Sequence, residues 1–212
     1  MFQRIRTSCL LGIKAIPVNV EVDSSAGLPG FTLVGLPDNA VRESRERVVS
    51  SIRSSGYAAS GSRMTVNLSP ADLRKEGTSL DLPLAIGMLI ASEEIQAENP
   101  ERFVFLGELS LDGKVKAVHG VLSVAMSLSK EDDVLVVPRE NVAEASLVEG
   151  LSVVGVSTLA ECIDAIAPGS AILPVRATGV SHRVLAADPS VPDFRSVVGM
   201  EGVKRALEIA AA

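Results

Sequence analysis

Aromatic side chains are scarce in this sequence. Phe, Tyr and Trp make up 3% of its 212 residues and tryptophan is absent, whereas 47% of the residues are hydrophobic. We therefore expect an aliphatic core, and base-stacking platforms of the kind that hold single-stranded nucleic acids have little to be built from. A chain of this length can bury one full hydrophobic core and part of a second one.

Cysteines and long apolar runs are also scarce. Cys9 and Cys162 are the two cysteines, and they lie far apart with neither a CxxC motif nor a pair of histidines nearby. This pattern argues against a standard zinc site and a disulfide framework, and it is typical of the reducing cytoplasm. The apolar run 9–13 is too short for a signal peptide, and the run 82–91 is about half of a membrane span. We expect a cytoplasmic protein with no metal site and no membrane partner.

A phosphate-binding loop is missing as well. In the Walker A motif, Gly-x-x-x-x-Gly-Lys-Ser/Thr, backbone N–H groups cradle the phosphates and the lysine reaches the β and γ oxygens. None of the six lysines in this sequence is followed by serine or threonine. We therefore expect these residues to bind no nucleotide cofactor on their own.

Charge is unevenly distributed. The chain carries 26 acidic and 20 basic side chains, a net charge of −6. Residues 40–76 contain seven basic and four acidic side chains, whereas residues 77–168 contain five basic and fifteen acidic ones. The first segment can attract phosphate and the second repels it.

The stretch 63–92 combines three kinds of local pattern. Residues 64–68 alternate between apolar and polar side chains, which predicts a half-buried strand. Residues 80–91 are apolar almost all round, which predicts a buried helix, and the polar turn 74–79 connects the two. Oxygens that can cap the start of the helix are supplied by Thr78, Ser79 and Asp81.

The rest of residues 1–166 alternates between strand and helix patterns, which predicts an α/β class. A helix over 39–54, capped by Asp38 or Asn39, has an apolar stripe at helical spacing and ends before Gly56. Further strands are expected at 10–13, 16–22, 31–34, 103–106, 134–137 and 152–156, and further helices at 121–128, 141–148 and 159–166. A hairpin is expected around 108–113.

Three arginines of the helix 39–54 have two interpretations. Arg42, Arg45 and Arg53 either belong to a solvated face with i,i+3 and i,i+4 ion pairs, or contact nucleic acid or another subunit. The sequence favours the solvated face and leaves the contact surface open.

Beyond residue 166 the composition and the hydrophobic periodicity of the sequence change. Residues 167–193 are rich in proline, glycine and serine and show no periodicity, which predicts a linker. Residues 202–212 then show an amphipathic helical pattern. We expect a first domain at 1–166, a linker at 167–193 and, at 194–212, the truncated beginning of a second domain.

The turn 75–79, Lys-Glu-Gly-Thr-Ser before a buried helix, resembles the nucleophile segment of Lon-type proteases, in which a serine works with a distant lysine. The resemblance puts Ser79 at the nucleophile. In that family the lysine follows a Gly-Gly-Leu-like turn further along the chain, and the matching segment here, 111–122, has Leu122 at that position. Because leucine cannot accept a proton, Ser79 lacks the base that would activate it.

Other side chains could act as the base for Ser79 only under further conditions. Lys114 and Lys116 replace the missing lysine only if the alignment slips by six residues or more. His119 is a further candidate, although a lone histidine beside a turn glycine is more often structural. We therefore expect no catalytic residue and interpret Ser79 as a capping residue, with a Lon-type serine hydrolase as the alternative function.

Several segments together resemble the magnesium-chelatase-like AAA ATPases of the YifB and ComM type. They are VEVDSSAGLPGFTLVGLPDNAVRESRERV, VNLSPADLRKEGTSLDLPLAIG, FLGELSLDGKV, VLVVP and DFRSVVGMEGVKRALEIAAA. The resemblance implies a Lon-protease-like N-terminal domain, of the ribosomal-protein-type βαβ fold, followed by an AAA+ motor in a hexameric ring. For ComM-type members it implies ATP-driven branch migration of DNA during natural transformation. It is no evidence that the chain chelates magnesium.

The resemblance also implies partners and cofactors for the full-length protein. It implies ATP and Mg, DNA, and other copies of the chain. It further implies that Val197, Val198 and Gly199 lie on the adenine side of the nucleotide site. The function expected of this chain is a regulatory, DNA-engaging or oligomerisation domain of such a ring ATPase.

Overall fold

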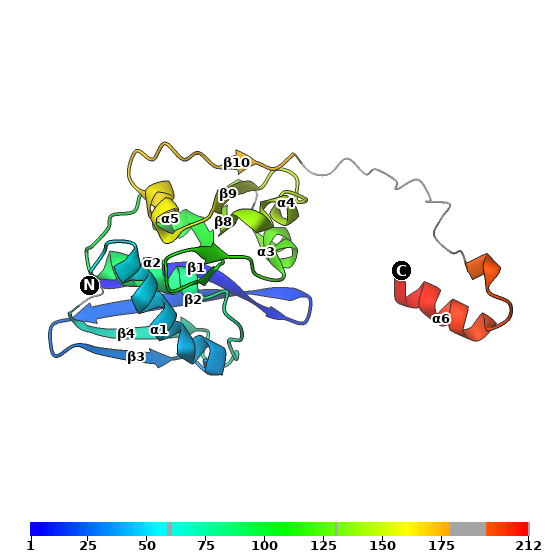
Figure 1. Ribbon diagram of the computed structural model, residues 1–212, viewed down its shortest axis with the longest axis horizontal. Coiled ribbons are helices and arrows are strands. Elements are labelled where there is room, and N and C mark those ends of the chain that lie inside the picture. Colours follow the sequence, from blue (N-terminus) through cyan, green and yellow to red (C-terminus); the bar gives the residue numbers. More distant parts are fainter. Residues whose placement is uncertain (59–60, 130, 179–193, 212) are drawn as a thin grey trace. The chain divides into compact units, whose positions relative to one another are not determined.

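The computed structural model describes residues 1–58, 61–129, 131–178 and 194–211. The chain divides into two compact units, Met1–Val180 and Ser181–Ala212 (Figure 1). The first unit contains all the described strands and helices α1 to α5, and the second contains a short 3-10 helix and α6. None of the described helices has the length and apolar character needed to cross a bilayer.

The first unit is built on a mixed eight-stranded sheet with the order β10-β9-β8-β5-β1-β2-β4-β3. Strands β5, β8 and β9 run parallel to β1, whereas β2 is antiparallel to both β1 and β4. At the two edges, β3 is parallel to β4 and β10 is antiparallel to β9. This architecture confirms the predicted α/β class with a mixed sheet. The strands are β1 (Phe2–Leu11), β2 (Lys14–Ser25), β3 (Gly30–Val34), β4 (Arg63–Ser69), β5 (Phe103–Phe105), β8 (Val134–Pro138), β9 (Ser152–Val156) and β10 (Val175–Arg176).

Alternation along the strands separates two hydrophobic clusters, one on each face of the sheet. Ile5, Val20 and Val66 pack in one cluster with residues of α1, α2 and α5. Val104 and Leu135 face the other way and pack with residues of α3 and α4. The other elements of this unit are α1 (Asn39–Ser54), α2 (Asp81–Ala91), η1 (Pro100–Arg102), the two-stranded β6 (Glu108–Leu109) and β7 (Val115–Lys116), α3 (Val121–Ser127), η2 (Arg139–Asn141), α4 (Val142–Ala145) and α5 (Leu159–Ile166).

The first strand is longer than the sequence predicted. The expected strand 10–13 is the end of β1 and a turn at Gly12, whose φ of 63° suits glycine. Arg4 and Arg6 obscured the beginning of β1, because their side chains lie on the face opposite α2 and form ion pairs there. Arg4 Nη2 lies 3.4 Å from Glu21 Oε1, and Arg6 Nη1 lies 2.5 Å from Asp133 Oδ1.

Two more predicted elements differ in the structure. The expected helix 141–148 is a 3-10 turn followed by the single-turn α4. Residues 175–176 form the edge strand β10, within the segment interpreted as a linker, and Ala177 is buried beside it. The first unit therefore continues past Ile166, and residues 179–193 of the predicted linker lie outside the described residues.

Helix α2 is buried along its whole length, with all 11 of its residues buried. Its sequence contains no run of β-branched residues, and Pro83 sits in the first turn, where its missing N–H costs no helical hydrogen bond. Gly87 lets the helix approach the sheet closely. A Cβ atom at this position would lie 2.9 Å from Val22 Cγ2 and 3.3 Å from Ile5 Cγ1.

We predict that Gly87→Ala destabilises the first unit by about 1–3 kcal/mol, because overpacking outweighs the higher helix propensity of alanine. Urea unfolding followed by circular dichroism measures the change. Gly202→Ala is the control, since a Cβ on this helical glycine meets nothing within 4 Å. Equal stability of Gly87→Ala and the unmodified chain would show that α2 does not pack closely on β1 and β2.

The second unit contains η3 (Phe194–Ser196) and α6 (Glu201–Ala211). Helix α6 is amphipathic, as the sequence predicted, but none of its residues is buried. Val203 and Leu207 on its apolar stripe are each 50% exposed.

Candidate functional site

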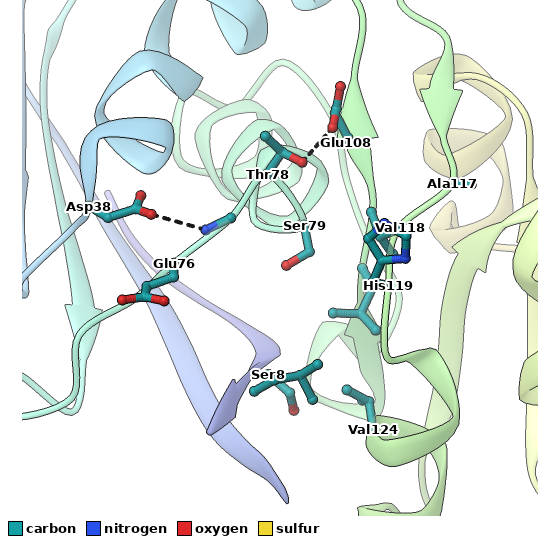
Figure 2. A pocket seen from close by; sticks show the side chains of 13 residues that line it. Ser8, Asp38, Glu76, Thr78, Ser79, Glu108, Ala117, Val118, His119 and Val124 are labelled. Atoms are coloured by element: carbon teal, nitrogen blue, oxygen red, sulfur yellow. Dashed lines mark hydrogen bonds between the residues drawn. The ribbon is translucent and has the colours of Figure 1, made fainter. Parts of the chain in front are cut away.

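A cavity of about 610 Å³ lies at the carboxyl ends of the parallel strands β1 and β5. We call it the Ser79 cavity (Figure 2). The turn before α2, the hairpin β6–β7 with the segment that follows it, and helix α3 close it from three sides. Its lining residues are Ser8, Leu10, Asp38, Glu76, Gly77, Thr78, Ser79, Leu106, Glu108, Ala117, Val118, His119 and Val124.

The turn 76–79 is held by hydrogen bonds to distant segments. Asp38, the N-cap of α1, accepts hydrogen bonds from the backbone N–H groups of Val41 at 2.7 Å and Gly77 at 3.3 Å. The Thr78 hydroxyl donates to the Glu108 carboxylate. These contacts fix the turn against both α1 and β6, and Figure 2 shows the bonds of Gly77 and Thr78 as dashed lines.

Ser79 does not cap α2, contrary to the prediction from the sequence. The N-cap position is Leu80, and no side chain donates or accepts a capping bond there. The first turn is satisfied from elsewhere, since the Leu82 N–H donates to the Gly107 carbonyl at 3.0 Å and the Gly107 N–H to the Ser79 carbonyl at 3.0 Å. Among the described residues, the Ser79 hydroxyl has no hydrogen-bond partner, and it lines the cavity.

No lysine lines the Ser79 cavity among the residues that the structure describes. Leu122, which the sequence resemblance aligned with the lysine of Lon-type proteases, is not a lining residue either, and its N–H donates to Glu144 Oε1 at 2.9 Å. Lys114 pairs with Asp112 at 2.8 Å, and Lys116 Nζ lies 4.0 Å from Glu108 Oε1. His119 does line the cavity, from an exposed position.

A fully buried lysine lies behind the turn. Lys75 donates from Nζ to the Pro70 carbonyl, and burial lowers the pKa of its ammonium below the ordinary value. The thiol of Cys9 is buried nearby, and desolvation raises its pKa to about 11. Both groups are enclosed in protein, so neither offers a reactive atom to the cavity.

A buried ion pair, which the sequence did not predict, connects the elements around the site. Asp81 is fully buried and accepts two hydrogen bonds from Arg47, from Nε at 2.7 Å and from Nη2 at 3.0 Å. Its Oδ2 also accepts the Leu109 N–H at 3.2 Å. Burial raises the pKa of Asp81, and the guanidinium opposes that rise. One carboxylate thus joins α1, α2 and β6.

The three arginines singled out from the sequence lie on the exposed side of α1. Arg45 lies 5.6 Å over the ring of Phe31 and pairs with Glu46 at 3.6 Å. Arg45 and Arg53 line a hollow of about 170 Å³ beside that ring. Arg42 is exposed, and its side chain pairs with none of the described residues. We call Arg42, Arg45 and Arg53 the arginine face, which the Ser79 cavity does not include.

The predicted adenine-side residues belong to the second unit. Val197 is 40% exposed and Val198 is 96% exposed, and Gly199 has a φ of 74° before α6. Within the described parts of the chain, no group of three or more His, Cys, Asp or Glu side chains is arranged to hold a metal ion.

Comparison with known proteins identifies the class to which this chain belongs. The model of the family described as subunit ChlI of Mg-chelatase matches residues 20–141. The YifB protein of Salmonella typhimurium is 40% identical over 214 residues, covering 98% of this chain and 40% of that protein. The competence protein ComM of Haemophilus influenzae is 38% identical over 203 residues, covering 95% of this chain and 40% of that protein.

The chain therefore belongs to the magnesium-chelatase-like family of YifB and ComM. It spans about 40% of the length of these relatives. A Lon protease of Salinispora arenicola is also similar, with 26% identity over 163 residues, which covers 70% of this chain and 20% of the protease.

We predict that Arg47→Met destabilises the first unit by about 3–5 kcal/mol, because it leaves the buried Asp81 carboxylate without its partner. The double variant Arg47→Met/Asp81→Leu should recover part of that loss, since it removes both charges but leaves the Leu109 N–H without its acceptor. Arg45→Met is the matched control on the same helix, and its exposed ion pair contributes at most about 1 kcal/mol. Urea unfolding at neutral pH measures all three, and equal losses for Arg47→Met and Arg45→Met would contradict the prediction.

Proposed function

We propose that this chain is the N-terminal regulatory, DNA-engaging or oligomerisation part of a bacterial AAA+ ring ATPase of the ComM type. The observation that carries the proposal is the 38% identity to the competence protein ComM over 95% of this chain. In this proposal the full-length protein is cytoplasmic, assembles as a hexamer, and uses ATP and Mg to move DNA branches during natural transformation. The segment that begins at about residue 194 starts the motor, and Val197, Val198 and Gly199 contact the adenine ring.

We further propose that the first unit has the fold of the Lon protease domain. Two observations support this: the similarity to the Lon protease of Salinispora arenicola, and the position of Ser79 in a turn between a strand and a buried helix at the wall of a cavity. The proposal concerns the fold and not the chemistry, because no lysine among the described residues lines that cavity.

The second candidate function is a serine hydrolase that uses Ser79. The free hydroxyl of Ser79 and the ring of His119, both on the cavity wall, favour it. Against it stand Asp38, Glu76 and Glu108, because nearby negative charge disfavours the ionised form of a nucleophile.

We predict that purified chain 1–212 does not react with a fluorophosphonate probe and does not hydrolyse casein. The reason is that no lysine among the described residues lines the cavity and that the His119 ring forms no hydrogen bond with the Ser79 hydroxyl in the described structure. Mass spectrometry of the probe-treated protein, with Ser79→Ala as the control, measures the modification. Labelling that is lost in both Ser79→Ala and His119→Ala would instead establish a serine–histidine hydrolase.

The arginine face provides the test of DNA engagement. We predict that the triple variant Arg42→Ala/Arg45→Ala/Arg53→Ala binds duplex DNA more weakly than the unmodified chain. The slope of log K against log salt should flatten by up to about one unit for each phosphate contact that is lost. Fluorescence anisotropy at several salt concentrations measures both quantities.

The control for this prediction removes three exposed arginines from other elements, Arg4→Ala/Arg102→Ala/Arg176→Ala. This variant keeps the same net charge as the first triple variant, so a difference between the two reports position rather than charge. An unchanged salt slope combined with loss of self-association would assign the arginine face to subunit contacts.

A further inference from the structure

We propose that the Ser79 cavity binds a primary alkylammonium ion, namely an amine on an apolar stem. The proposal goes beyond the ring-ATPase function and does not depend on it. Three properties of the cavity support this inference: the sign of its charge, a nearly buried hydroxyl that no described residue satisfies, and its apolar wall.

The charged lining residues of the cavity are carboxylates. Asp38, Glu76 and Glu108 line it, whereas no lysine or arginine of the described residues does. Two of the three have a cation at the surface: Arg74 Nε lies 3.3 Å from Glu76 Oε1, and Lys116 lies 4.0 Å from Glu108. Asp38 has no cationic partner in the described structure, and the cavity therefore favours a positively charged occupant.

Ser8 is the second, independent observation. It is only 3% exposed, it lies on the face of β1 turned toward α3, and it lines the cavity together with Leu10. No described residue forms a hydrogen bond with its hydroxyl. Polar groups with so little exposed surface are normally satisfied, so a polar group that enters the cavity would find a hydrogen-bond partner in this hydroxyl. The unpaired hydroxyl of Ser79 lines the same space (Figure 2).

The arrangement of acceptors favours an ammonium over a guanidinium. A guanidinium is best matched by one carboxylate that presents both of its oxygens. Asp38 already accepts an N–H bond at each oxygen, and Glu108 accepts the Thr78 hydroxyl. Glu76 is already paired with Arg74. The other acceptors, among them the hydroxyls of Ser8 and Ser79, are single atoms on separate elements, which suits the three N–H donors of an ammonium group.

The apolar part of the cavity favours a ligand whose ammonium group is carried on an apolar stem. Leu10, Leu106, Val118 and Val124 form a wall beside the polar groups. Methylene groups gain free energy when they leave water for such a surface, while the charged end stays with its acceptors. A volume of about 610 Å³ is in the range of small-molecule sites and can accept a stem of several carbons.

The test titrates the chain 1–212 with n-pentylamine while backbone amide NMR signals are recorded. We expect saturable shifts at Gly77, Thr78, Ser79 and His119. The neutral isostere n-pentanol should give no saturable shift at the same concentrations. Absence of saturation by n-pentylamine at about 10 mM, or equal binding of n-pentanol, would overturn the proposal, because charge recognition is its basis.

Variants locate the binding. Glu108→Gln and Asp38→Asn each replace a carboxylate by a neutral amide, so we expect each to weaken binding of n-pentylamine about tenfold. The N-cap of α1 is kept in Asp38→Asn, because asparagine also caps helices. Glu149→Gln removes an exposed carboxylate outside the cavity and should bind n-pentylamine normally. If either cavity variant fails to fold, Glu76→Gln in the exposed turn replaces it. Normal binding by the folded cavity variants would overturn the proposal.

A second series of probes distinguishes the source of the amine. N-acetyl-lysine methylamide presents the ammonium as it occurs in a protein, and cadaverine presents it as a free diamine. Tighter binding of the lysine compound would identify a lysine side chain of a peptide as the ligand. Tighter binding of cadaverine would identify a free polyamine-like molecule. N-acetyl-arginine methylamide should bind at least about tenfold more weakly than the lysine compound, and equal binding would contradict the preference for ammonium.

Discussion

The ion pair between Arg47 and Asp81 is the interaction on which the arrangement of the site depends. Asp81 has no exposed surface, so its charge is compatible with folding only while Arg47 and the Leu109 N–H remain in place. This requirement fixes α1 and β6 relative to the start of α2. The turn 76–79 lies immediately before that start, and its contacts to Asp38 and Glu108 come from the same two neighbouring regions.

The same ion pair sets the rotation of α1. Because Arg47 points inward beside the buried Ser44 and Val48, the side chains of Arg42, Arg45 and Arg53 point outward. Helical periodicity gave no reason to separate Arg47 from the exposed charges of this helix. Its true partner is 34 residues away along the chain, and helical spacing carries no information about a contact between two helices.

The elements that the sequence predicted well are those whose signal is local. Helices α1 and α2 and strands β4, β8 and β9 have a clear period or an uninterrupted apolar run, and their ends agree with the structure within a residue or so. The beginning of β1 was missed because its exposed face carries arginines, and β10 because two residues have no period. The sequence singled out the turn with Ser79 but did not predict the cavity, because Ser8, Asp38 and Glu108 reach it only through the tertiary fold.

The charge of the residues that line the cavity decides whether Ser79 can act as a nucleophile. A serine nucleophile requires a base and an environment that tolerates negative charge. The described lining of this cavity has no lysine and three carboxylates, so it disfavours the alkoxide that a hydrolase must form. Those carboxylates are acceptors of the kind that hold a cation without reacting with it. This turn, whose cavity is lined by carboxylates and by no lysine of the described residues, is therefore physically better suited to binding than to catalysis.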